Sequence, residues 1–216
     1  SSNSLHTTID IMQHSINKGL NHFLCMNVAY YKNEDSSVYN FFKNIIKAAP
    51  DSRIVLYNFS KLSGYAFSQE VTARLTKDFP QIVGMKDSTG NLWNNFKSKN
   101  FSMFVGSEKK LTDNLKINGA GVISATTNFS GSLAKKVYDD FKKTGSSPDD
   151  EKLKAIRTAF DETGNLISAL HTLKSIENKV YANLLPPLEL LSQNKKDELI
   201  KKLKELGVLN NKNMAA

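Results

Sequence analysis

The feature that most constrains this fold is a regular alternation of short apolar runs with helical segments over residues 1–143. Strand-like runs occur at residues 22–28, 53–57, 82–86, 102–106 and 121–125. Helical spacing of apolar residues occurs at residues 7–18, 37–49, 68–77, 109–117 and 132–143. Because the strands are short and almost wholly apolar, and helices separate them, the pattern predicts a parallel sheet covered on both faces.

Beyond residue 143 the alternation stops, and helical patterns follow at residues 149–173, 179–185 and 194–206. About five strand–helix units fit either an open doubly wound sheet or most of a (β/α)8 barrel, and a complete barrel typically needs roughly 250 residues. We expect a partial barrel over residues 1–143, a helical region over 144–212, and a short tail at 213–216.

Composition excludes several other classes of protein. The chain is 40% hydrophobic, which argues against a disordered protein, and its single cysteine excludes an internal disulfide framework. The four histidines lack carboxylates at metal-ligand spacing, so we expect no metal site. No apolar run approaches the ~20 residues of a membrane span, and no signal-peptide pattern is visible, which together predict a cytoplasmic protein.

The net charge of +8 raises the possibility of a nucleic-acid partner. However, the lysines are dispersed and alternate with acidic residues, as in the segment NKKDE at residues 194–198. This pattern favours a solvated surface over an anion-binding patch. We therefore predict neither a nucleic-acid nor a membrane partner.

Polar residues end the predicted strands, where the active site of a parallel α/β fold lies. Lys86 ends the third strand and shares a face with Ile82 and Gly84. If this face lines a barrel, burial favours the neutral amine, which can form a Schiff base with a carbonyl. The alternative is a lysine that extends into solvent. Tyr57 ends the second strand, as either a proton relay or a half-buried aromatic with a hydrated hydroxyl.

Several segments resemble the dihydrodipicolinate synthase / N-acetylneuraminate lyase family, which comprises class I, pyruvate-dependent aldolases. They are IVLYNF at residues 54–59, LSG at 62–64, IVGMKDS at 82–88 and GVIS at 121–124, together with Tyr30 and Tyr31. The resemblance runs from residue 1 to about residue 206. It implies a (β/α)8 TIM barrel whose three N-terminal strands lie outside this chain, assembled as a homodimer or homotetramer. It implies no further cofactor, since the lysine itself supplies the electron sink.

The resemblance also implies roles for individual residues. Lys86 would condense with the keto carbon of pyruvate, or of a 2-keto acid that is being cleaved. Tyr57 would shuttle protons at the iminium, and Tyr31 would complete this relay in a neighbouring subunit across a dimer interface. Backbone groups near Gly106 and Ile123 would line the pyruvate pocket.

The second substrate is indicated by Leu62 and Ser63. The synthases of the family carry an arginine at the position of Leu62, where it binds the carboxylate of aspartate semialdehyde, and loss of such a bidentate partner is not a neutral change. The pair looks more like that of sialic-acid lyases and 2-keto-3-deoxy sugar-acid aldolases. We therefore expect a lyase that joins pyruvate to an aldehyde, or releases it. It would resemble either the dihydrodipicolinate synthases or the sialic-acid and 2-keto-3-deoxy sugar-acid aldolases, and Leu62 favours the second group. The alternative is a non-catalytic keto-acid-binding or interaction protein on the same scaffold.

Overall fold

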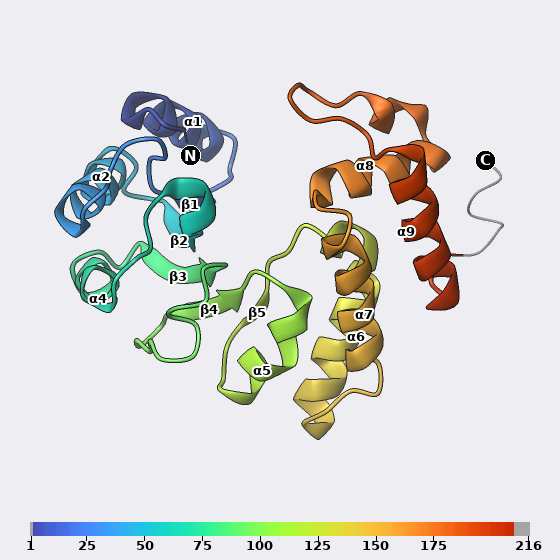
Figure 1. The fold of residues 1–216 in the computed structure, drawn as a ribbon. Coiled ribbons are helices and arrows are strands. Elements are labelled where there is room, and N and C mark those ends of the chain that lie inside the picture. The colour runs from blue at the N-terminus through green and yellow to red at the C-terminus, as the bar shows by residue number, and fades with distance from the viewer. Residues whose placement is uncertain (1, 210–216) are drawn as a thin grey trace. The chain divides into compact units, whose positions relative to one another are not determined.

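The computed structural model describes residues 2–209 (Figure 1). The described chain forms two compact units. The first contains the residues up to Gly106 together with Asp113–Ile123, and the second contains Ser107–Thr112 and the residues from Ser124 onward. The tail expected at residues 213–216 lies outside the described residues. Within residues 2–209, no helix is both long and apolar enough to cross a membrane.

The first unit is built on a five-stranded parallel sheet. Its strands are β1 (His22–Met26), β2 (Arg53–Asn58), β3 (Ile82–Asp87), β4 (Ser102–Val105) and β5 (Gly121–Val122). Each of them was predicted from the sequence, although β5 is shorter than expected. The strand order is β1-β2-β3-β4-β5, so every strand pairs with the next one along the chain. This sequential order is that of a barrel wall, since a doubly wound sheet reverses its order at a switch point.

Helices connect these strands. They are α1 (Leu5–Asn17), α2 (Asp35–Ala48), the short α3 (Ser60–Ser63), α4 (Gln69–Asp78), the 3-10 turn η1 (Glu108–Lys110) and α5 (Leu111–Lys116). Ser68 was expected to begin α4, and its hydroxyl accepts a hydrogen bond from the Val71 N–H at 3.0 Å. Because this bond satisfies one of the free N–H groups of the first turn, it fixes where α4 starts. The helix α3 was not predicted, because a single turn leaves no periodic signal.

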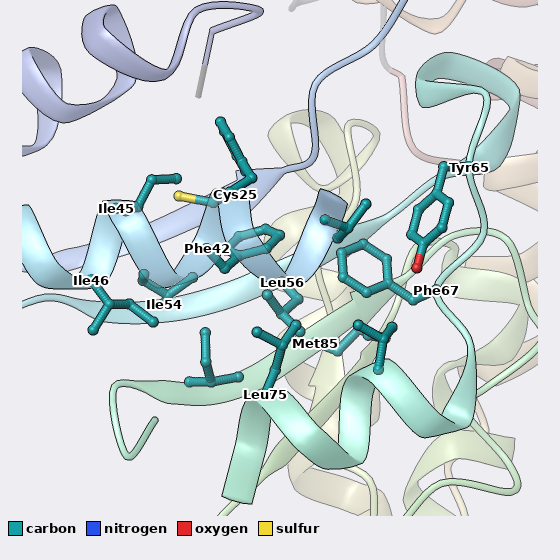
Figure 2. Close-up of a cluster of buried hydrophobic side chains, with 14 of the residues drawn as sticks. Cys25, Phe42, Ile45, Ile46, Ile54, Leu56, Tyr65, Phe67, Leu75 and Met85 are labelled. Carbon is teal, nitrogen blue, oxygen red and sulfur yellow. The ribbon is translucent and has the colours of Figure 1, made fainter. Parts of the chain in front are cut away.

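The core of the first unit lies between the helices and one face of the sheet (Figure 2). In α2, the apolar residues Val38, Phe41, Phe42, Ile45 and Ile46 are all buried and follow the spacing of one helical face. They pack in one cluster with the strand residues Ile54, Leu56 and Met85, each of which is 0% exposed. Burial of one such side chain stabilises the fold by about 1.5–3 kcal/mol.

The opposite face of the sheet carries a different row of side chains. Cross-strand pairing aligns Met26 with Tyr57, Tyr57 with Lys86, and Lys86 with Phe104. Successive strand residues point to opposite faces, so this row alternates with the core residues Leu56 and Met85. In a closed barrel the face away from the helices is the interior, so Lys86 and Tyr57 lie on the interior face.

The second unit is helical. It contains α6 (Thr127–Thr144), α7 (Asp150–Asp161), α8 (Leu166–Glu177), the 3-10 turn η2 (Lys179–Ala182) and α9 (Gln193–Glu205). The single helix predicted over residues 149–173 is wrong, since the chain breaks between α7 and α8. Gly164 has a φ of +85° there, and the Asn165 side chain caps α8 by accepting the N–H groups of Ile167 and Ser168. Apolar residues continue at helical spacing on both sides of this break, which hid it.

Candidate active site

Lys86 and Tyr57 form the centre of the candidate site, at the carboxyl ends of neighbouring strands. Pairing of β2 with β3 places them directly opposite each other. The Lys86 Nζ lies 4.1 Å from the centroid of the Tyr57 ring, and both side chains are half-buried. A cation at this distance is attracted to the electron-rich face of the ring. The Tyr57 ring stacks in turn on Phe59 at 6.0 Å, so two aromatic rings support the amine.

Gly84 allows the strands β3 and β4 to approach each other closely beside the Lys86 amine. Gly84 shares the interior face with Lys86, two residues earlier in β3. A Cβ atom at this position would lie 2.4 Å from the Ser102 carbonyl oxygen of β4. Only glycine therefore allows the close approach of β3 and β4, and no side chain stands next to Lys86 on the N-terminal side.

The two residues expected to line the pyruvate pocket follow the neighbouring strands. Gly106 comes directly after β4, and a Cβ atom there would lie 2.0 Å from the Ser88 Oγ. The Ile123 N–H donates to the Val105 carbonyl at 3.0 Å, which extends the pairing of β4 with β5 by one residue. Both positions therefore lie at the carboxyl edge of the sheet that also carries Lys86.

Tyr31 lies away from the strands, on the loop between β1 and α2. It is 64% exposed, and its ring contacts the edge of the Tyr30 ring at a centroid distance of 5.2 Å. Tyr30 is 90% exposed and has a φ of 77°, which is an uncommon conformation for a bulky residue. Exposed, conformationally constrained aromatic residues are a common feature of binding surfaces. The role of Tyr31 in a neighbouring subunit stays a prediction.

The two residues expected to contact the second substrate lie in α3. Leu62 is 59% exposed, while Ser63 is 1% exposed. The Ser63 hydroxyl lies 2.9 Å from the Tyr65 carbonyl oxygen and accepts the Tyr65 N–H at 3.3 Å. The Ser63 side chain is thus used within its own turn, which Gly64 ends with a φ of +69°. Leu62 is the residue of this pair that offers an exposed side chain.

The second unit contains a buried ion pair that was not predicted from the sequence. Glu108 is 0% exposed, and one of its carboxylate oxygens lies 3.0 Å from Nη1 of Arg157 on α7. The hydroxyls of Ser124 and Thr126 also donate to Glu108. This cluster joins the segments that directly follow β4 and β5. Glu108 and Ser124 are polar residues near the ends of predicted strands, but no signal in the sequence marked Arg157, which is separated from Glu108 by 49 positions.

Asp161 extends this cluster and stabilises the charged form of Arg157. It accepts hydrogen bonds from Nε of Arg157 and from Nζ of Lys109, both at 2.8 Å. Burial alone would lower the pKa of Arg157, but the hydrogen bonds to Asp161 and Glu108 outweigh it and raise this pKa. Burial opposes ionisation of Asp161, yet its two cationic partners lower its pKa. Both groups therefore keep their charges.

Metal-ligating side chains are not grouped in the described chain. Among residues 2–209, no group of three or more histidine, cysteine, aspartate or glutamate side chains has the arrangement needed to hold a metal ion. The polar centre of the described site is the Lys86–Tyr57 pair, whose chemistry is that of an amine beside a phenol.

A parallel sheet in barrel order, with a lysine on its interior face, defines a (β/α)8-barrel protein. The chain matches the model of the dihydrodipicolinate synthetase family over residues 1–206, and it belongs to this family. The family expected from the sequence is thereby confirmed. The expected barrel fold and lyase class are confirmed by the solved structures and named relatives that the chain resembles.

The proteins that the chain resembles in sequence include a synthase and a probable sugar-acid aldolase. It is 25% identical over 221 residues to the 4-hydroxy-tetrahydrodipicolinate synthase of Methanopyrus kandleri, covering 96% of this chain and 71% of the relative. It is 26% identical over 218 residues to a probable 2-dehydro-3-deoxy-D-pentonate aldolase of Escherichia coli, covering 95% of this chain and 72% of the relative. The crystal structure of dihydrodipicolinate synthase from Thermotoga maritima superimposes with a TM-score of 0.86 at 22% identity, covering 97% of this chain and 74% of that one.

Proposed function

We propose that the protein is a Schiff-base-forming lyase that joins pyruvate to an aldehyde, or releases pyruvate from a 2-keto acid, through Lys86. The observation that carries this proposal is the position of the Lys86 amine, on the interior face of the sheet and 4.1 Å from the Tyr57 ring. Membership of the family, and the names of a synthase and a sugar-acid aldolase among the relatives, support the same reaction class.

In this reaction the neutral Lys86 amine attacks the keto carbon of pyruvate, and the carbinolamine that forms takes up a proton and loses water to give an iminium. A proton then leaves the methyl carbon, and the resulting enamine carbon attacks the aldehyde carbonyl, whose oxygen takes up a proton. Water finally hydrolyses the iminium, which restores the neutral amine and releases the proton taken up in the first step. The reverse sequence cleaves the carbon–carbon bond. Tyr57 moves protons at the iminium and at the aldehyde oxygen, and Tyr31 of a neighbouring subunit completes this relay.

The surroundings of Lys86 suit a reaction that passes through a cation. The Tyr57 ring faces the amine nitrogen, so its negative face also stabilises the positive charge of the iminium. Gly106 follows β4, which pairs with β3, and Ile123 follows β5, which pairs with β4. In this proposal their backbone groups line the pyruvate pocket. No further cofactor is needed in this scheme, because protonated nitrogen is itself the electron sink.

For the aldehyde, we favour a sugar-acid substrate over aspartate semialdehyde. Leu62 offers an exposed apolar side chain at the position where the synthases carry a carboxylate-binding arginine. An apolar side chain cannot replace the paired hydrogen bonds of a guanidinium. The exposed Tyr30–Tyr31 pair supports a homodimer or homotetramer, in which Tyr31 enters the partner's site.

Reductive trapping tests the proposed function. The protein is incubated with pyruvate and borohydride, and the modified residue is located by peptide mass spectrometry. We expect a reduced pyruvate adduct on Lys86, none in Lys86→Ala, and an unchanged yield in Lys47→Ala, which removes an exposed lysine of α2. An adduct that persists in Lys86→Ala would refute the proposal. Pyruvate binding without any adduct would support the non-catalytic keto-acid-binding alternative instead.

A further inference from the structure

The residue that follows each proposed catalytic side chain is polar yet almost fully buried. Asn58 comes after Tyr57 and is 0% exposed, and Asp87 comes after Lys86 and is 2% exposed. Because strand residues alternate between faces, Asn58 and Asp87 lie on the helix-covered face behind the catalytic pair. Burial of a carboxylate or an amide is costly unless hydrogen bonds satisfy it, so their partners explain why these residues are tolerated here.

Asp87 accepts four hydrogen bonds. Its Oδ1 accepts the Asn58 side-chain amide at 2.9 Å and the Gly90 N–H at 2.8 Å. Its Oδ2 accepts the backbone N–H groups of Leu92 at 2.8 Å and Trp93 at 2.9 Å. Every partner is a donor, so an asparagine at this position would direct its own NH2 group at other N–H donors. Asp87 thereby ties the loop after β3 back to the end of the strand.

Asn58 uses both ends of its amide. Its Nδ2 donates to Asp87 and also to the Asn91 Oδ1 at 2.7 Å. Its Oδ1 accepts the Phe67 N–H and the Thr89 hydroxyl, each at 3.2 Å. Its backbone carbonyl accepts the Ser88 N–H at 2.9 Å, which continues the pairing of β2 with β3 beyond the catalytic residues. Asn58 and Asp87 therefore lock the ends of two strands together.

We propose that Asn58 and Asp87 are positioning residues that fix the separation of Lys86 from Tyr57. Their Cα atoms lie about 3.8 Å along the chain from those of the catalytic pair, so little movement is left to Lys86 and Tyr57 when Asn58 and Asp87 are held. This inference rests on the proposed function, because it concerns the pair that would carry it. A displacement of about 1 Å between reacting groups costs up to roughly 100-fold in rate.

The substitution Asp87→Asn tests the inference, since it keeps the shape of the side chain and removes two acceptor positions. We expect imine formation at saturating pyruvate to slow by about 10- to 100-fold, with a smaller change in the KM for pyruvate. The readout is the single-turnover rate of the borohydride-trapped adduct, corrected for the folded fraction measured by circular dichroism. A merely structural role would lower the folded fraction but leave this corrected rate unchanged.

Asp35→Asn is the matched control. The half-buried Asp35 accepts the Tyr65 hydroxyl at 2.6 Å on one oxygen and the Ser68 hydroxyl on the other, so the same exchange replaces one hydrogen-bonded carboxylate oxygen by an NH2 group at the start of α2. We expect Asp35→Asn to lower stability and to keep the corrected rate of the parent protein.

If Asp87→Asn does not fold, a milder variant tests whether Asn58 and Asp87 position the catalytic pair. Thr89→Val removes the hydroxyl that donates to Asn58 and accepts the Ser60 N–H at 2.9 Å, on a half-buried residue. We expect a corrected rate a few-fold below that of the parent. Corrected rates equal to the parent value in the folded variants would overturn the inference while leaving the proposed function intact. A parent protein that forms no adduct on Lys86 would instead overturn the proposed function, and the inference with it.

Discussion

The substitution Gly106→Ala probes how closely β3 and β4 approach each other at the site. An alanine Cβ at this position would lie 2.0 Å from the Ser88 Oγ, 2.9 Å from its Cβ and 3.1 Å from its Cα. Rotation of the serine hydroxyl relieves the shortest of these distances. The two carbon atoms of Ser88 stay too close, however, because the backbone fixes where they lie. The substitution therefore forces β3 and β4 apart at their carboxyl ends.

Overpacking of this kind costs about 1–3 kcal/mol. For a chain of 150–250 residues, each kcal/mol lowers the Tm by roughly 2–4 °C, so Gly106→Ala should lower it by about 2–12 °C. The φ of Gly106 is not in the left-handed region, so the cost is steric and a removal of atoms from Ser88 should relieve it. We expect the double variant Ser88→Gly/Gly106→Ala to recover most of the loss, since only the backbone of residue 88 then stays close to the new methyl group.

Thermal unfolding of the parent, both single variants and the double variant completes a mutant cycle. Gly131→Ala is the control, because a Cβ atom there meets no other atom within 4 Å and the residue lies inside α6. Alanine is favoured over glycine in a helix by about 0.5–1 kcal/mol, so this control should keep or raise the Tm. An unchanged Tm in Gly106→Ala, or no coupling with Ser88, would show that the strands are not in close contact.

Three further outcomes follow from the buried charged and thiol groups. Arg157→Met should lower the free energy of unfolding by about 3–5 kcal/mol because it leaves the buried Glu108 unpaired, whereas the double variant with Glu108→Gln should lose less, as measured by urea denaturation. Burial raises the pKa of the Cys25 thiol to about 11, so native protein at pH 8 should resist a thiol reagent that modifies the unfolded chain rapidly. The lowered pKa of Asp161 stabilises the fold above its ordinary pKa near 3.8, and this contribution is lost as the pH falls through the folded value. Asp161→Asn should therefore weaken the acid sensitivity of the urea midpoint below about pH 4.

Much of the first unit could be predicted from the sequence, for a physical reason. Parallel strands covered by helices are apolar along most of their length, so each strand stood out as a short run between helical patterns. The boundaries were harder to predict where the signal was local. The break at Gly164 could have been found, since a glycine followed by an N-capping asparagine is a helix-end signal. The pairing of neighbouring strands was not visible, and it is this pairing that distinguishes a barrel wall from an open sheet.

Only part of the candidate site could be predicted from the sequence. Lys86 and Tyr57 could be found because they interrupt apolar runs at strand ends, where α/β proteins place their chemistry. Asn58 and Asp87 looked like the first polar residues of loops, since a sequence does not show that Asp87 accepts four buried donors. Arg157 was hidden for the same reason, because its partner Glu108 is distant in sequence and its helix otherwise follows an ordinary amphipathic pattern.

The alternation of a β-strand explains why each catalytic candidate comes with a buried polar neighbour. A side chain that points to the interior face is followed by one that points to the helices, so Tyr57 is paired with Asn58, and Lys86 with Asp87. In the proposed function the first member of each pair meets the substrate, and the second holds the loop that follows its strand through hydrogen bonds. The two members of a pair are subject to different requirements. The first must have the chemical groups that the reaction needs, and the second must form the hydrogen bonds that hold the strand end in place. A variant that keeps Lys86 but loses Asp87 should therefore retain the Lys86 amine but lose its alignment with Tyr57, and imine formation should slow as a result.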